Sequence, residues 1–147
     1  HTRNAGASWG IDPTPGIVQQ ASVDWTTRRA YVCLENEPGE PHPPASRRAL
    51  DAAGSWTSVG PNARYAGAGN GVLLVQDVDG ALHRSTDHGA TFVPVTVPSA
   101  PLEIVDIAFS ASTPTRIYAI DHVAGRLLRS DDGGAVWAPM AALAPAL

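Results

Sequence analysis

The sequence predicts an all-β fold built from repeated four-stranded units, and three observations lead to this prediction. The 147 residues include 14 Gly and 13 Pro, which suit many short strands joined by turns. The runs between these turns are short and β-rich, and none has the length and period of an amphipathic helix. The third observation is an internal repeat, because Gly71–Val95 and Arg116–Met140 are identical at nine of 25 positions, without a gap, at an offset of 45.

The repeat centres on the pattern R-S-x-D-x-G-A-x-[FW], with two clear copies and two weaker ones. The motif residues, in chain order, are Thr2, Asn4, Gly6, Trp9, Asp51, Trp56, Ser85, Asp87, Gly89, Phe92, Ser130, Asp132, Gly134 and Trp137. The aromatic ends of the four copies are 47, 36 and 45 residues apart. A period in this range is typical of a propeller blade or a solenoid unit.

Each period contains four candidate strands, which favours the propeller. In the last period we expect strands at Ile104–Phe109, Arg116–Asp121, Arg126–Ser130 and Ala135–Met140. In the middle period we expect a short, poorly marked strand near Ala63–Ala66, then Val72–Gln76, Ala81–Ser85 and Thr91–Val95. In the first we expect Ser22–Trp25, Arg29–Leu34, Arg47–Ala49 and Ser55–Val59. The chain, residues 1–147, is therefore predicted to be one partial β-propeller: an outer strand of a preceding blade in 1–16, then blades at 17–60, 61–97 and 98–147.

The motif is predicted to fix the tight turn between the third and fourth strands of a blade. A short Asp side chain accepts hydrogen bonds from turn N–H groups, and Gly tolerates the left-handed backbone. The aromatic residue that follows can pack between neighbouring blades. A catalytic residue or metal ligand would be expected once, not in every blade. Arg48, Arg84 and Arg129 each precede the motif Asp by three residues, which indicates a structural role such as pairing with a neighbouring blade.

The pattern S-x-D-x-G-x-x-[FW] resembles the Asp-box, or bacterial neuraminidase repeat (BNR), of β-propeller proteins. Similar repeats occur in sialidases, xyloglucanase-type glycosidases, sortilin-type receptor domains and photosystem assembly factors. The resemblance implies the fold and an extracytoplasmic location, secreted or periplasmic. It does not imply one function, because these relatives do unrelated things.

Three blades do not close a propeller, which usually needs at least four. We therefore expect another segment or chain to complete the ring. One alternative is that the sequence is a fragment or one chain of a longer propeller, which we favour because of the outer strand in 1–16. The other is a homo-oligomer in which two sets of three blades form the ring.

Composition excludes several classes of partner and site. The net charge is −4 and all ten basic residues are Arg, which does not suit nucleic-acid binding. No apolar run approaches the roughly 18 residues of a membrane span. The only cysteine, Cys33, rules out an internal disulfide framework and a Cys-rich zinc site. We predict no cofactor and no metal.

A candidate binding face lies at the blade edge opposite the motif turns. It gathers the second-to-third strand turns and the connectors near Ile11–Gln20, Pro61–Gly71 and Pro98–Leu102. Its candidate residues are acidic or His: Glu35, Glu37, Glu40, His42, Asp77, Asp79, Asp121 and His122. They could bind a cation or supply paired carboxylates for glycoside hydrolysis, or they could form a solvated, Pro-stiffened loop and plain hairpin turns.

The residues favour a binding module over an enzyme. The F/Y-R-I-P motif of sialidases has no match, since the nearest segment is Thr115–Tyr118. Xyloglucanase-type enzymes use two catalytic Asp residues, and no motif selects among Asp24, Asp106 and Asp121. We predict a non-catalytic binding or scaffold subunit for a protein or carbohydrate ligand. The alternative is part of a glycoside hydrolase, sialidase-like or xyloglucanase-like.

Overall fold

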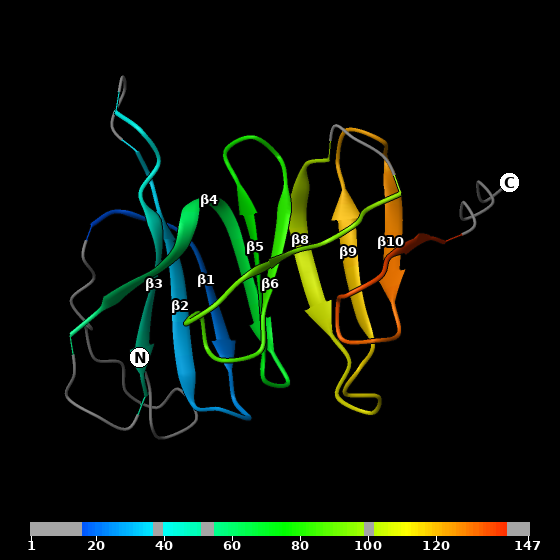
Figure 1. Ribbon diagram of the computed structural model, residues 1–147, viewed down its shortest axis with the longest axis horizontal. Coiled ribbons are helices and arrows are strands. Elements are labelled where there is room, and N and C mark those ends of the chain that lie inside the picture. Colours follow the sequence, from blue (N-terminus) through cyan, green and yellow to red (C-terminus); the bar gives the residue numbers. More distant parts are fainter. Residues whose placement is uncertain (1–15, 37–39, 51–54, 99–101, 141–147) are drawn as a thin grey trace, which may run out of the picture.

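The computed structural model describes residues 16–36, 40–50, 55–98 and 102–140. Within these ranges every regular element is a β-strand (Figure 1). No helix in them is long and apolar enough to cross a membrane. The motif residues Thr2, Asn4, Gly6, Trp9 and Asp51, and Glu37 of the candidate binding face, lie outside the described residues.

Eleven strands form antiparallel ladders between neighbours in the described chain. They are β1 (Val18–Asp24), β2 (Arg29–Leu34), β3 (Pro44–Ala49), β4 (Thr57–Gly69), β5 (Val72–Asp77), β6 (Leu82–Ser85), β7 (Val93–Pro94), β8 (Ile104–Phe109), β9 (Ile117–Asp121), β10 (Arg126–Ser130) and β11 (Ala138–Pro139). Strands β1 to β7 are hydrogen-bonded in chain order, and β8 to β11 form a separate four-stranded sheet.

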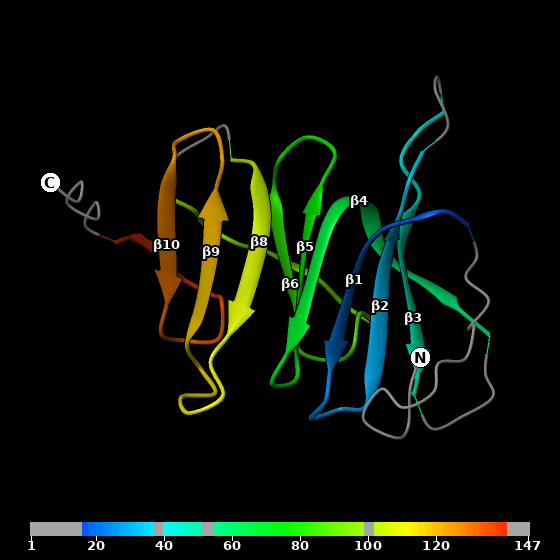
Figure 2. The ribbon, with the colours of Figure 1, turned by 180° about the vertical axis from the view of Figure 1, so that it is seen from behind.

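The long strand β4 belongs to two blades. Its first part, up to Asn62, pairs with β3, and its second part, from Ala63, pairs with β5. Figure 2 shows β4 passing from the first blade to the second. Gly60, with φ of +77°, adopts a left-handed backbone conformation two residues before Asn62, the last residue of β4 that pairs with β3. The seven-stranded ladder is therefore two blades in series, and β8–β11 form the third.

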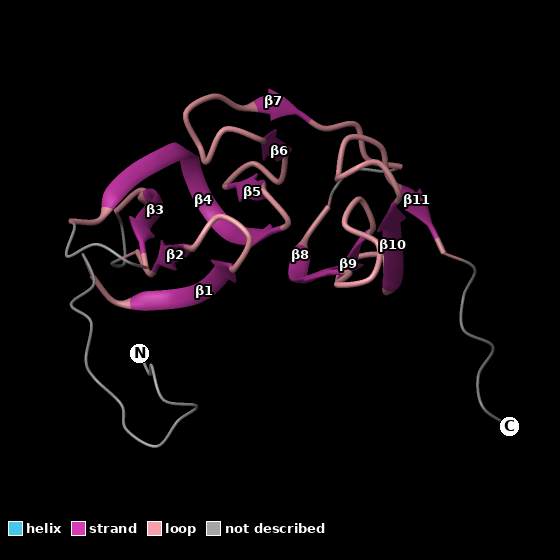
Figure 3. Ribbon diagram, turned by 90° about the horizontal axis from the view of Figure 1, so that it is seen from below, coloured by secondary structure: helices cyan, strands magenta, loops and turns pink. Residues whose placement is uncertain are grey.

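The three blades stand face to face in an arc. Figure 3 shows the first strand of each blade, which we call the inner strand (β1, the second part of β4, and β8), on one side of the arc. One buried apolar cluster joins the first and second blades, around Tyr31 and Leu73, and another joins the second and third, around Leu74 and Ile117. This arrangement confirms the predicted all-β partial propeller of four-stranded blades.

Two glycines let the second and third blades approach closely at their inner strands. A Cβ added to Gly67 would lie 3.0 Å from the Cβ of Ile107, and one added to Gly69 would lie 2.5 Å from Cγ of Phe109. Real Cβ atoms do not come as near to carbon as one at Gly69 would, so only glycine fits there, whereas at Gly67 the side chain of Ile107 would have to yield by a few tenths of an ångström.

Several details of the predicted strands are wrong, and β1 and β3 begin four and three residues before the predicted Ser22 and Arg47. The first strand of the middle blade is not short, since it runs from Ala63 to Gly69 within β4. The outermost strands β7 and β11 have two residues each, fewer than predicted, because the motif turns occupy the residues before them. The gapless offset of 45 between the repeats also fails in the second strand, because Asp77 of β5 corresponds in the structure to Asp121 of β9. The reason is that the turn after β9 is one residue longer than the turn after β5.

Candidate functional site

Each inner strand contains a β-bulge at the equivalent place. The pairing of the inner strand with the next strand skips one residue in every blade: Gln19 in β1, Arg64 in β4 and Val105 in β8. A bulge turns the extra side chain away from the regular alternation of the strand, and bulges are over-represented beside functional sites.

The three bulge residues line one hollow of about 430 Å³. It lies at the blade edge where the inner strands begin, which is also the edge of the turns after β5 and β9 (Figure 1). The other residues that line it are Gln20, His42, Tyr65, Gln76, Glu103 and Ile104. The hollow thus receives residues from all three blades.

Two of its side chains are committed to holding neighbouring inner strands together. Gln20 Oε1 accepts a hydrogen bond from the backbone N–H of Ala66, at 3.0 Å between nitrogen and oxygen. The phenolic oxygen of Tyr65 accepts one from the N–H of Ile107, at 2.9 Å. Burial raises the pKa of Tyr65 to about 12, against the opposing effect of that backbone hydrogen bond, so its phenol stays neutral.

Gln76 fixes the connector that enters the third blade. Its amide donates to the carbonyl of Leu102 at 2.7 Å and accepts from the N–H of Ile104 at 2.9 Å. Gln76 is 1% exposed, so this satisfied pair of bonds is a buried structural contact. Glu103 lies between the two bonded residues and lines the hollow.

The remaining polar side chains are available to a ligand. Within the described ranges, no hydrogen bond or ion pair engages the side chains of Arg64, Gln19 or Glu103. Nδ1 of His42 is buried and has no hydrogen-bond partner among the described residues. The hollow therefore combines one guanidinium, one carboxylate, one imidazole and amide groups, which suits a ligand with both donors and acceptors.

Asp77 and Asp121 occupy equivalent turns and act as caps there. Oδ1 of Asp77 accepts from two turn N–H groups, at 2.9 and 3.0 Å, and Oδ2 contacts Nε2 of His83 at 2.7 Å. Burial acts to raise the pKa of Asp77, but the hydrogen bonds, chiefly that from His83, outweigh it and lower the pKa. Asp121 is fully buried and its Oδ2 is paired with Arg126 at 2.9 Å. These two carboxylates are thus engaged by neighbouring groups of their own blades.

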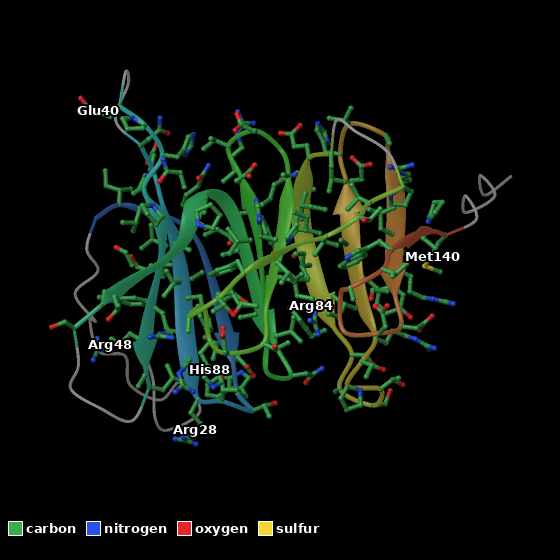
Figure 4. The ribbon with its side chains drawn as sticks, viewed as in Figure 1. Arg28, Glu40, Arg48, Arg84, His88 and Met140 are labelled. Atoms are coloured by element: carbon green, nitrogen blue, oxygen red, sulfur yellow. The ribbon has the colours of Figure 1, made fainter. Side chains whose placement is uncertain are left out.

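The other predicted members of the candidate binding face do not converge. Glu35, Glu40, Asp79 and His122 are exposed, and Figure 4 shows Glu40 at the far end of the first blade. Of the predicted set, only His42 lines the hollow. Within the described chain, no three His, Cys, Asp or Glu side chains are close enough to hold a metal ion.

The motif turns of the second and third blades have the same hydrogen bonds. Ser85 Oγ donates to Oδ1 of Asp87 at 2.7 Å and accepts from the N–H of Gly89 at 2.8 Å. The equivalent bonds in the third blade, from Ser130 to Asp132 and from Gly134 to Ser130, have the same lengths. These geometries are those of turn-stabilising groups.

The aromatic ends of the motif differ in burial. Trp137 is buried between the second and third blades, and its indole N–H donates to the carbonyl of Gly134 at 3.0 Å. Phe92 is half-buried against the cluster that joins the first two blades, and Trp56 is half-buried. Cys33 belongs to that same cluster, and burial raises the pKa of its thiol to about 12. Cys33 is therefore unsuited to act as a nucleophile.

An arginine of the first blade and one of the second each reach the motif turn of the next blade. Arg84 Nε donates to the carbonyl of Gly133 at 2.6 Å, and Arg47 Nη1 donates to the carbonyl of His88. The expectation that the recurring arginines pair with a neighbouring blade is met by Arg84. In the first blade the position is taken by Arg47 and not by Arg48, since Arg47 faces the second blade.

Sequence reasoning placed the connectors at this edge but missed the bulge residues. From the first blade to the second the bulge recurs after 45 residues, yet from Arg64 to Val105 the interval is 41. A gapless comparison therefore could not align the inner strands. A search with separate offsets for each strand could have found them.

Comparisons of the sequence identify no relative. No protein-family model matches the chain, and no curated protein matches it. The solved structures do give matches. A YCF48 structure from Cyanidioschyzon merolae has 16% identity and a TM-score of 0.60, over 86% of this chain and 38% of that one.

Two further structures show the same likeness. A structure of YCF48 bound to D1 peptide has 16% identity and a TM-score of 0.62, over 92% of this chain and 44% of that one. A GH74 enzyme from Niastella koreensis has 14% identity and a TM-score of 0.64, over 87% of this chain and 18% of that one. This chain thus spans less than half the length of each. At these identities the likeness shows the fold alone: the chain forms part of a β-propeller.

Proposed function

We propose that the chain is a non-catalytic binding or scaffold part of an Asp-box β-propeller, and that the hollow at its bulged inner strands binds an extended peptide. The observation that carries this proposal is the convergence of Gln19, Arg64 and Val105 on one hollow. Three equivalent bulges, one from each blade, give a single site shared by the whole arc.

The chemistry of the hollow suits a peptide. An extended peptide presents both N–H donors and C=O acceptors, and the hollow offers both kinds of partner through Gln19, Arg64 and Glu103. The side chain of Val105 supplies an apolar contact. One solved propeller of similar fold, YCF48, has been determined with a D1 peptide bound, which makes a peptide the first ligand class to test.

The same geometry argues against the glycosidase alternative. Glycoside hydrolysis uses two carboxyl groups about 5–9.5 Å apart across the scissile bond. The described lining of the hollow includes one carboxylate, Glu103. Asp24 and Asp121 end their strands at opposite edges of the blades, and each accepts a hydrogen bond from a turn N–H, that of Thr26 and that of Ala124 respectively.

The test is a binding screen against an array of acidic, basic and uncharged peptides, read by fluorescence anisotropy. We expect Arg64→Ala and Glu103→Ala to weaken the best peptide by about tenfold each, the loss of one charge-assisted hydrogen bond. Arg28→Ala is the matched control, because Figure 4 shows Arg28 at the opposite edge of the first blade.

Two results would contradict the proposal. One is the absence of any peptide whose binding depends on Arg64. The other is turnover of fluorogenic glycosides that Asp121→Asn or Glu103→Gln abolishes, because this would restore the glycosidase alternative. An extracytoplasmic location is part of the proposal through the Asp-box resemblance, and fractionation of the source cells tests it.

A further inference from the structure

The two-residue turn between β4 and β5 is held by both neighbouring blades. Asn70 and Gly71 form this turn, and their φ angles of +53° and +81° are both positive, as in a type I′ hairpin turn. We infer that Asn70 is a site of deamidation which contact with the neighbouring blades suppresses, so that the modification marks chains whose blades have separated. The turn lies at the blade edge opposite the hollow (Figure 1), so the inference is independent of the proposed peptide.

The sequence singles out Asn70 for this reaction. Of the four Asn residues in the chain, only Asn70 precedes a Gly, and the others precede Ala or Glu. Asn is among the thermolabile residues, and its side chain is attacked by the backbone nitrogen of the residue that follows. Gly71 has no Cβ to shield that nitrogen, so the Asn70–Gly71 pair is the most reactive of the four.

The reaction replaces the side-chain amide with a carboxyl group. The nitrogen of Gly71 bonds to Cγ of Asn70 and loses its proton, and the side-chain nitrogen takes up a proton and leaves as ammonia. This step forms a five-membered imide. Water then opens one of the two ring C–N bonds, and residue 70 becomes either Asp or an isoaspartyl residue, in which the chain runs through Cγ. Water is the only reactant besides the protein.

The third blade holds the amide that has to leave. Nδ2 of Asn70 donates to the carbonyls of Ser110 and Pro114, at 3.0 and 3.1 Å. Both carbonyls belong to the turn between β8 and β9, which has hydrogen bonds of its own. The N–H of Thr113 donates to Oγ of Ser110 at 3.1 Å, and the N–H of Ser110 donates to the carbonyl of Arg116 at 3.0 Å. The two N–H groups of the amide thus meet two acceptors that are fixed in place.

The first blade holds the nitrogen that attacks. The N–H of Gly71 donates to Oδ2 of Asp24 at 2.9 Å. Asp24 is 1% exposed, and its other oxygen accepts the N–H of Thr26 at 3.0 Å, so this acceptor is also fixed. Ring closure requires rotation about the Cα–C bond of Asn70, out of the left-handed turn conformation, and this rotation breaks the bond to Asp24. The folded arc therefore opposes the reaction from both sides.

The product does not fit the same contact. A carboxylate at position 70 carries only acceptors, and it would face the carbonyl oxygens of Ser110 and Pro114. Two hydrogen bonds are lost and like partial charges are brought together, which opposes closure of the third blade onto the second. An isoaspartyl residue also lengthens the backbone of a two-residue turn. A chain modified while open is thus hindered from closing again.

The experiment follows deamidation by mass spectrometry of tryptic peptides after incubation in a mildly alkaline buffer. Cleavage after Arg64 and Arg84 gives the peptide Tyr65–Arg84, in which Asn70 is the only Asn. Isomerisation of Asp79 in the same peptide leaves the mass unchanged and does not interfere. We expect the folded chain to react at least about tenfold more slowly than the chain unfolded in urea, because the turn must open before the ring closes. Equal rates, or no reaction in the unfolded chain, would overturn the inference.

Two serine variants test the role of the third blade. Ser110→Ala removes the acceptor of the Thr113 N–H and loosens the turn that holds Asn70, while it leaves the backbone carbonyls in place. We expect it to raise the rate in the folded chain about two- to tenfold, the effect of one lost hydrogen bond on opening. Ser112→Ala is the matched control, because its Oγ contacts only Ser110 Oγ, at 3.4 Å, within the described residues. Equal rates for the two variants would overturn the role of this turn.

A second pair of variants tests the effect of the product. Asn70→Asp reproduces the carboxylate, and Asn70→Gly removes both donors while it tolerates the positive φ. We expect the urea midpoint of Asn70→Asp to be lower than that of Asn70→Gly by about 0.3–1 M, because only the former adds repulsion. Equal midpoints would overturn the proposed effect on closure. A peptide that binds the hollow leaves all these results unchanged, so this inference and the proposed function can fail separately.

Discussion

Gly69 sets how closely the second and third blades approach, and Gly69→Ala tests this directly. The added Cβ would lie 2.5 Å from Cγ and 2.8 Å from Cβ of Phe109. Carbon atoms in contact are normally about 3.5–4.0 Å apart, so the ring or the strand has to move by about 1 Å. The atoms that clash are at the base of the Phe109 side chain, which cannot swing away without a change of backbone position.

Overpacking of this kind costs about 1–3 kcal/mol of unfolding free energy. For a chain of this size, that lowers the melting temperature by about 2–12 °C. Urea denaturation followed by tryptophan fluorescence measures the free energy, and Trp137 reports on the same interface because it is buried there. Gly16→Ala is the matched control, since its added Cβ would lie 3.6 Å from the nearest side chain, an ordinary contact.

The clash also predicts a rescue. Phe109→Ala removes Cγ and the ring, which include the nearest clashing atom, and should destabilise the wild-type chain, yet it should cost less in the Gly69→Ala background. A double-mutant cycle therefore gives a coupling energy of about 1 kcal/mol. Stability of Gly69→Ala within about 0.5 kcal/mol of the wild type, or strictly additive effects, would refute the reasoning from blade spacing.

Three further predictions concern the interface and the motif turn. Leu74→Ala, at a side chain with no exposure between two blades, should cost about 2–5 kcal/mol in urea denaturation, and a loss under 1 kcal/mol would contradict the packing. Ser130→Ala leaves buried turn groups without a partner and should cost about 1–3 kcal/mol, whereas the exposed Thr86→Ala should cost little. The backbone hydrogen bond from Val136, above all, lowers the pKa of Asp132, so the folded state binds its proton less tightly than the unfolded state does. The ionised Asp132 carboxylate therefore contributes fully to the free energy of unfolding above about pH 4, and this contribution is lost as the pH falls further. Asp132→Asn should make the free energy of unfolding depend less on pH between pH 5 and about pH 2.

Much of the fold could be predicted from the sequence because each blade repeats local chemistry. The spacing of Ser130, Asp132 and Gly134 specifies a turn whose hydrogen bonds all lie within five residues. The third strands of the second and third blades, which lead into such turns, were placed to within one residue, as β6 and β10 show. The inner strand of the second blade was underestimated because five of the seven residues in Ala63–Gly69 are Ala or Gly, which carry little β-propensity.

The candidate site was less predictable because it depends on register between strands. Arg64 looks like an ordinary strand residue until its pairing with β5 shows that it is skipped. Carboxylates such as Asp77 and Asp121 stand out in the sequence, yet the turns that they cap engage them. Acidic residues in hairpin turns are thus weak indicators of a site. A bulge changes the direction in which a side chain points, and the type of residue at a position does not reveal that a bulge is there.

Adjacent residues of an inner strand have different roles, one in the hollow and the next in the contact between blades. Directly after each bulge, Gln20 and Tyr65 turn toward the next blade and bond its backbone, while the bulge residue just before each of them turns into the hollow. Because of the extra residue in the bulge, one position lines the hollow and the next position contacts the neighbouring blade. In the third blade the same step places Val105 in the hollow, while Oδ1 of Asp106 accepts a hydrogen bond from the phenol of Tyr65 at 3.4 Å. A fourth blade with its own bulge would then add one more side chain to the hollow, so completion of the ring would extend the binding site without rearranging the part formed by these three blades.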